Sequence, residues 1–368
     1  MMKDEDLIYV LALQHVPRIG DITAKKLIHH CGSPAAVFES SARALCAIDG
    51  VGTATIKGLL DAKHMQEAEK ELQYIKDNEI TSLYFKANDY PEKLKHCIDS
   101  PLLLFQVGNI NLKEKRIISV IGTRKITRYG VAFCEKLIEE LAPFDPVIVS
   151  GFAYGTDITA QKAALAHRLQ TVGCLAHGFD QIYPKSHKKY MRQVENHGGF
   201  LTEFWTSDPF ERTNFLKRNR IIAGMSEATI VIESAEKGGS LVTADIANSY
   251  GKDVFALPGR VTDRQSMGCN TLIKTHQAHV LSNPLDIPYI LNWELENLKK
   301  PTVQKQLFVA LNSQEQCIYK YLNANGKQGL DDISRHCEMP TFTVVGLLLQ
   351  LELKGVVNPL PGKLFELA

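Results

Sequence analysis

The chain has 368 residues, of which 45% are hydrophobic and 23% are charged, with 42 basic residues against 41 acidic ones. This composition is typical of a globular protein of two or three domains and excludes a disordered chain. A net charge of +1 provides no overall field that attracts nucleic acid or membrane, so any polyanion site must be local.

The sequence also argues against a membrane protein and against a metal or disulfide scaffold. No apolar run approaches the roughly 18 residues of a membrane span, and the acidic start MMKDEDLIYV lacks the features of a secretory signal. The eight cysteines lie far apart with no CxxC pair, which favours reduced thiols. We therefore expect a cytoplasmic protein without membrane contact and without a metal site.

Residues 1–85 predict a helical domain that contains two similar turns. Val16–Gly20 precedes a helix expected at 22–30, and Ile48–Gly52 precedes one expected at 53–62. An apolar–x–Gly–apolar–Gly turn resembles the helix-hairpin-helix element (SAM-like domains), whose free backbone N–H groups hold a DNA phosphate. Only the second turn has both glycines, and the segment is net acidic. DNA contact and a packing or protein-contact role both remain open.

Residues 86–285 predict an α/β domain with a mainly parallel sheet covered on both faces. Short apolar, β-branched runs alternate there with longer amphipathic stretches, as in successive βαβ units. The ligand site of such a sheet lies beyond the carboxyl ends of its strands. The runs expected to form strands are Leu102–Gln106, Ile117–Ile121, Val147–Val149, Thr171–Leu175, Gly199–Leu201, Ala228–Ile232, Val254–Ala256 and His279–Leu281.

Three glycine turns follow expected strands, and each precedes a helix. They are Gly122–Lys125, Ser150–Asp157 and Lys237–Ala244. Together their backbone N–H groups would form one anion-binding shelf, to which Arg124 can add a bidentate phosphate contact. None of them is a GxGxxG or a GxxxxGK[ST] motif, so neither an NAD site nor a P-loop is supported, and we expect no cofactor.

The segment Asn214–Arg220 is the most informative part of the chain. It places three cations, two amides and one aromatic ring within seven residues, before an apolar helix expected at Ile221–Met225. Such a mixture suits a single strand of nucleic acid, with phosphates on the cations and a base stacked on Phe215. No acid pair or Ser–His–Asp order accompanies it, so we expect no catalytic residue.

The last part of the chain predicts a linker at 286–312 and a winged-helix-like domain at 313–368. Residues 313–368 show three helical segments followed by a hairpin with a Pro-Gly turn. A recognition helix in a DNA groove normally carries Arg, Lys, Asn or Gln. Residues 341–351 offer mostly Val and Leu, with Gln350 as the only amide, which favours protein contact or a structural role.

Together these motifs resemble the DNA-processing protein A (DprA/Smf) family of natural transformation. The matching strings are SVIGTRKITRYG, VSGFAYGTD, TVGCLAHGFDQIYP, NFLKRNRIIAGMS, GGSLVTADIA, VFALPG and NTLI, in order over about 90–285. The resemblance implies an extended Rossmann-like, doubly wound domain. It also implies a protein that binds and protects incoming single-stranded DNA, forms a homodimer and loads the RecA recombinase, with no catalytic step.

The resemblance implies that phosphates contact Arg124, Lys217, Arg218 and Arg220 and that Phe215 stacks on a base. The other predicted DNA-binding residues are Gly122, Thr123, Ser150, Gly151, Gly155, Asn219, Gly238, Gly239 and Ser240. The chain departs from the usual SGxARGID pattern at Tyr154 and Thr156, has Gln161 in the following stretch, and has Leu216 where proline is common.

Two other functions remain open. Related lysine-decarboxylase-like proteins hydrolyse nucleoside monophosphates with a PGGxGTxxE turn, but the glutamate is absent from the turn Glu236–Ala244. Alternatively, the chain is mainly a scaffold whose terminal domains bind partner proteins.

Overall fold

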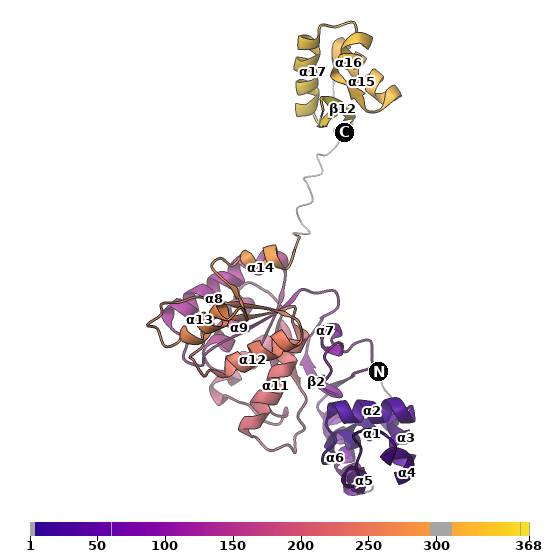
Figure 1. Cartoon of the computed structure of the whole chain (residues 1–368), viewed down its shortest axis with the longest axis vertical. Helices are drawn as coiled ribbons and strands as arrows, with labels where there is room; N and C mark the ends of the chain where they lie inside the picture. The colour runs from indigo at the N-terminus through magenta and orange to yellow at the C-terminus, as the bar shows by residue number, and fades with distance from the viewer. Residues whose placement is uncertain (1–3, 60, 295–310, 361, 368) are drawn as a thin grey trace. The chain divides into compact units, whose positions relative to one another are not determined.

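The computed structural model describes residues 4–59, 61–294, 311–360 and 362–367 (Figure 1). They belong to two compact units, residues 1–294 and 295–368. Residues 295–310 of the predicted linker lie outside the described residues. No helix in the described part of the chain is long and apolar enough to cross a membrane.

The first unit begins with a group of short helices that share a core with the neighbouring sheet. Leu11, Leu27 and Ile28 have no exposed surface, and the same apolar cluster includes Phe105 and Trp205. The helical part is therefore anchored on the sheet through a continuous hydrophobic core. Its helices are α1 (Asp4–His15), α2 (Asp21–Cys31), α3 (Pro34–Glu39), α4 (Ala42–Cys46), α5 (Thr53–Leu59) and α6 (Lys63–Asp77).

A nine-stranded sheet forms the centre of the described part of the first unit, in the order β1-β2-β6-β5-β4-β3-β7-β8-β9. The neighbours from β6 to β9 are parallel, whereas β1–β2 and β2–β6 are antiparallel pairs. The strands are β1 (Thr81–Tyr84), β2 (Leu103–Gly108), β3 (Ile117–Ile121), β4 (Val147–Ser150), β5 (Thr171–Cys174), β6 (Gly198–Thr202), β7 (Ala228–Val231), β8 (Asp253–Ala256) and β9 (His279–Val280). Each strand expected from the sequence is present, and β1 is an additional one.

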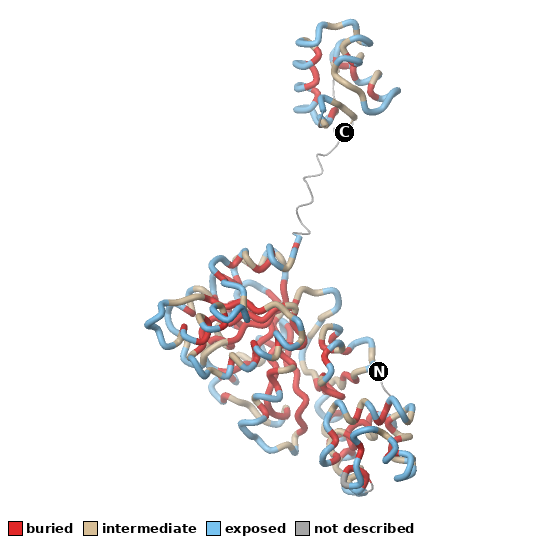
Figure 2. The backbone as a smooth tube through the Cα atoms, in the orientation of Figure 1, coloured by how far each residue is buried: buried red, intermediate tan, exposed pale blue. Residues whose placement is uncertain are grey.

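Helices cover both faces of the sheet, as the doubly wound pattern predicts. Ile117 and Ile121 of β3 belong to one apolar cluster, while Ile118 and Val120 belong to another on the opposite face, because successive side chains of a strand alternate. Figure 2 shows this buried centre in red. The helices are α7 (Glu92–Lys95), α8 (Arg128–Leu141), α9 (Thr156–Ala166), α10 (Lys188–Asn196), α11 (Arg212–Met225), α12 (Gly239–Ser249), α13 (Met267–Lys274) and α14 (Asp286–Ile290), with 3₁₀ turns at Ala142–Phe144 and Lys185–His187.

The cationic segment does not precede a helix but lies within one. Helix α11 begins at Arg212, nine residues before the expected start at Ile221. No proline or glycine interrupts residues 212–223, so the helix extends back through the polar residues. The cations are consequently distributed around a helix rather than along an extended ribbon.

The second unit has the winged-helix order that the sequence predicts. The side chain of Asn312 accepts a hydrogen bond from the N–H of Glu315 and forms a capping box with it at the start of α15. Helix α17 exposes an apolar face that includes Phe342, Leu349 and Leu353. The elements are α15 (Ser313–Asn325), β10 (Gln328–Gly329), α16 (Leu330–His336), α17 (Thr341–Leu353), β11 (Val357–Leu360) and β12 (Leu364–Leu367), with the strands in the order β10-β12-β11.

Candidate nucleic-acid interface

A cavity of about 810 Å³ opens at the carboxyl ends of β3, β4 and β7. Strand β3 lies between β4 and β7. The strands that follow β3 in the chain are therefore added first on its β4 side and later on its β7 side. This reversal of strand order is the usual ligand site of an open α/β sheet. Nine of the predicted site residues line the cavity: Gly122, Thr123, Arg124, Phe215, Arg218, Asn219, Gly238, Gly239 and Ser240.

The loop after β3 is held by Glu233 at the end of β7. The N–H of Thr123 donates to the main-chain carbonyl of Glu233 over 2.7 Å. The buried carboxylate of Glu233 accepts hydrogen bonds from the N–H and the hydroxyl of Thr127, at 2.8 and 2.6 Å, which fixes the start of α8. The side chain of Arg124 extends from this fixed loop and is exposed at the cavity.

The loop after β4 is closed on itself by the buried carboxylate of Asp157, and the buried guanidinium of Arg218 lies nearby. Asp157 accepts hydrogen bonds from the N–H groups of Gly151 and Ala153, at 3.1 and 3.3 Å. The guanidinium of Arg218 donates to the carbonyls of Gly151, over 2.8 Å, and of Cys174. These amides are therefore already occupied, and the predicted shelf of free N–H groups does not include them.

Glycine is required at position 151 because the side chains of Arg218 and Asp157 leave no room for another side chain. A Cβ atom there would lie 2.6 Å from both Arg218 Nη2 and Asp157 Oδ2. Burial raises the pKa of Asp157 above its usual range, and the guanidinium of Arg218 offsets part of that effect. Burial likewise lowers the pKa of Arg218. Arg218 thus forms the floor of the cavity and is only 4% exposed.

Helix α12 provides amides that are free. It begins at Gly239, directly at the cavity, and the N–H groups of Gly239 and Ser240 donate no hydrogen bond to any described residue. The hydroxyl of Ser240 donates to that of Ser234 over 2.9 Å. The first turn of a helix carries partial positive charge and orphan donors, so this end of α12 suits a phosphate.

The two faces of α11 line two different cavities. Arg212, Phe215 and Asn219 face the cavity at the sheet edge, whereas Lys217 and Arg220 face a second one of about 420 Å³. A helical period of 3.6 residues separates these two sets onto opposite sides. The structure therefore does not bring all the predicted cations together: Lys217 and Arg220 line the second cavity, whereas Arg124 and Arg218 line the first.

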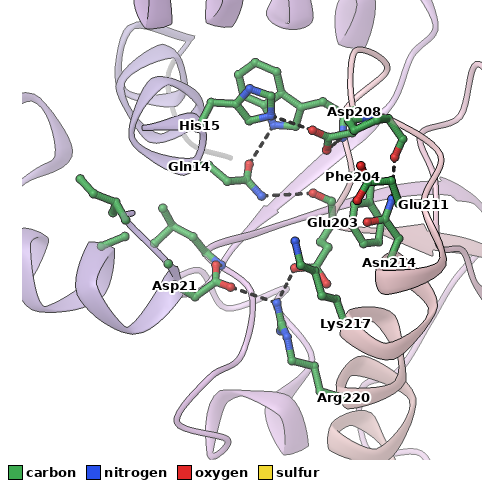
Figure 3. A pocket seen from close by; sticks show the side chains of 16 residues that line it. Gln14, His15, Asp21, Glu203, Phe204, Asp208, Glu211, Asn214, Lys217 and Arg220 are labelled. Carbon is green, nitrogen blue, oxygen red and sulfur yellow. Dashed lines mark hydrogen bonds and ion pairs between the residues drawn. The ribbon is translucent and has the colours of Figure 1, made fainter. Parts of the chain in front are cut away.

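Figure 3 shows the second cavity, between the helical part and the β6–α11 connection. Arg220 donates to Asp21 of α2, over 2.9 Å, and to Glu203. Burial raises the pKa of Glu203 to about 7. His15 lies 3.1 Å from Asp208 and stacks on Trp205, with 3.6 Å between the ring centroids. Arg220 therefore links helix α2 of the helical part to the segment that follows β6.

Two residues that line the first cavity were not among the predicted site residues but bring aromatic rings to it. Phe210 and Tyr183 lie 5.7 and 5.6 Å from Phe215, measured between ring centroids. Arg212 was not among the predicted site residues either, although it lies one helical turn before Phe215. The three-residue spacing could have placed Arg212 beside Phe215, but only if the helix had been expected to begin at residue 212. No pattern in the sequence predicts that the loop residues Phe210 and Tyr183 line this cavity.

The remaining predicted residues support the loops from beneath. The hydroxyl of buried Ser150 donates to the carbonyl of Val120 over 2.7 Å. Gly155 has φ +76°, and a Cβ there would lie 2.3 Å from the carbonyl oxygen of Thr123. Among the departures from the family pattern, Tyr154 is 44% exposed and accepts a hydrogen bond from Ser186.

The chain matches two family models. One, described as DNA recombination-mediator protein A, matches residues 81–292, and the other, the DprA winged helix domain, matches residues 306–363. Among curated relatives, Protein Smf of Escherichia coli is 34% identical over 278 residues, which cover 74% of each chain. A putative DNA processing protein DprA of Mycobacterium tuberculosis is 33% identical over 273 residues, covering 74% of this chain and 70% of the relative.

Two solved structures are also similar. DNA processing protein A from Streptococcus pneumoniae has a TM-score of 0.66 at 29% identity, covering 80% of this chain and 99% of that one. DNA processing protein A from Helicobacter pylori, described for its single-stranded DNA binding mode, has a TM-score of 0.53 at 30% identity, covering 59% and 98%.

Proposed function

Because this chain belongs to the DNA-processing protein A (DprA/Smf) family, we propose that it binds single-stranded DNA at the cavity of β3, β4 and β7 without catalysing a reaction. The observation that carries this proposal is the combination of groups at one sheet edge. Two exposed cations, Arg124 and Arg212, the free N-terminus of α12 and a set of aromatic rings all line the same cavity. Single-strand binding sites typically combine cations, which bind the phosphates, with aromatic rings, on which the bases stack.

The acidic groups near the cavity support a binding role. Asp157 is engaged by two backbone amides, and Glu233 is engaged by Thr127. Each is thus held in a structural contact rather than presented to a ligand as a general base. The hydrolase alternative predicts release of free base from nucleoside monophosphates. We expect none when the purified protein is incubated with them.

The experiment compares cations at the cavity with a cation on the opposite face of α11. Arg124→Ala and Arg212→Ala remove cations at the cavity, and each should weaken the affinity for fluorescent oligo-dT about 10- to 100-fold, the value of a charged hydrogen bond. Lys217→Ala is the matched control, because Lys217 is an exposed cation on the opposite face of α11. Equal losses in all three variants, or none, would contradict the proposed site.

We further propose that the protein acts in the cytoplasm as a homodimer in DNA uptake, protects the incoming strand and loads RecA onto it. Family membership supports this part. The test is RecA filament formation on oligo-dT coated with a single-strand binding protein, together with light scattering for the dimer. Failure to accelerate filament formation would refute RecA loading, and a monomer at micromolar concentration would refute the dimer.

A further inference from the structure

The aromatic ring expected to stack on a base is already covered by its neighbours. The guanidinium carbons of Arg124 and Arg218 lie 5.1 and 5.8 Å from the ring centroid of Phe215, which places both cations over the ring. Phe210 and Tyr183 approach the same ring at interplanar angles of 87° and 76°. Phe215 is half-buried as a result, and its face is occupied by cations.

Phe210 has the open surface that Phe215 lacks. It lies in the β6–α11 connection, two residues before Arg212, lines the cavity and is 44% exposed. Three rings pack against it, with centroids at 5.1 Å for Tyr183, 5.7 Å for Phe215 and 5.9 Å for His177. A ring that is held in place and still exposed can accept a base at little cost in conformational entropy.

We propose that Phe210 is the residue on which a nucleobase of the bound strand stacks, with the flanking phosphates at Arg124 and Arg212. This inference rests on the proposed function, because it names the base-binding part of the same cavity. Phe215 acts instead as a support that positions Arg124 and Phe210. Stacking uses the face of a base rather than its hydrogen-bonding edge, so the contact does not depend on base identity.

The test combines a protein variant that lacks the ring with a DNA strand that lacks the bases. Phe210→Leu keeps an apolar side chain but removes the ring, and an oligonucleotide with abasic sites keeps the phosphates but removes the bases. We expect Phe210→Leu to weaken oligo-dT binding about 5- to 150-fold, the range of one base–aromatic stack. The same variant should bind the abasic strand as tightly as the original protein does.

A second variant gives a direct signal. Phe210→Trp keeps an aromatic ring and should retain the affinity for oligo-dT, and its fluorescence should be quenched by oligo-dT but not by the abasic strand. Trp205 and Trp293, the two native tryptophans, are buried and serve as the background. The unchanged protein provides the reference for that background.

The outcomes separate this inference from the proposed function. If the unchanged protein does not bind oligo-dT, the proposed function fails. If it binds and Phe210→Leu binds equally well, or the loss extends equally to the abasic strand, the stacking role of Phe210 is wrong. If Phe215→Leu alone shows the base-dependent loss, the stacking residue is Phe215, as the sequence predicts.

Discussion

Replacement of Arg218 should lower the free energy of unfolding, because this arginine is buried and has a structural role. Its guanidinium satisfies the carbonyls of Gly151 and Cys174 and lies beside Asp157, all within the interior. Arg218→Met would leave the carboxylate of Asp157 buried without its counter-charge. It would also leave two buried carbonyls without a donor, at about 1–3 kcal/mol each. We therefore expect a loss of about 3–5 kcal/mol, a large part of the roughly 5–15 kcal/mol that stabilises a typical domain.

Tryptophan fluorescence in urea measures this loss in the first unit alone, because both tryptophans, Trp205 and Trp293, belong to residues 1–294. With a slope of roughly 2–3 kcal/mol per molar urea, Arg218→Met should lower the unfolding midpoint by about 1–2 M. The double variant with Asp157→Asn should cost about 1–3 kcal/mol less than the sum of the two single variants. An unchanged midpoint in Arg218→Met would refute the structural role of this arginine and favour a direct phosphate contact.

Three further outcomes are expected. Burial raises the pKa of Glu203 to about 7, above the roughly 4.3 of an unfolded glutamate, so the unfolded chain loses this proton first. The first unit should therefore lose on the order of 3 kcal/mol as the pH rises from about 4.5 to 7; Glu203→Gln should flatten this dependence in urea titrations, and parallel pH profiles would contradict it. Gly155→Ala should cost at least about 1–3 kcal/mol, because φ is +76° and the new Cβ meets the carbonyl of Thr123; an unchanged urea midpoint would disprove this. Asn312→Ala removes the capping side chain of α15 and should cost about 1 kcal/mol, seen as roughly fivefold faster hydrogen exchange over residues 313–325, and equal exchange rates would count against it.

Most strands of the sheet were predictable from the sequence because they are buried on both faces. All five residues of β3 are buried, so the sequence shows a short continuous apolar run whose bounds match the strand. β1 was not predicted, because Thr81–Tyr84 begins with two half-buried polar residues and does not form a continuous apolar run. It joins the sheet through its pairing with β2.

The composition of the site was predictable only in part, because it depends on where α11 begins. A ribbon presents all of its cations together, whereas a helix divides Arg212 and Phe215 from Lys217 and Arg220. The occupied amides of the β4 loop could not be foreseen either. The acceptor, Asp157, is close in sequence, but the choice between a free and a closed loop depends on tertiary packing of Arg218 against it.

The salt dependence of single-strand binding tests the central claim most directly. The claim is that phosphates are held at the cavity by Arg124 and Arg212, and each phosphate contact contributes about −0.7 to the slope of log K against log salt. For the double variant Arg124→Ala/Arg212→Ala, the slope for oligo-dT binding should therefore be less negative by about 1.4. Lys217→Ala should keep the original slope. An unchanged slope in the double variant, or a reduced slope in Lys217→Ala, would show that the strand is bound elsewhere.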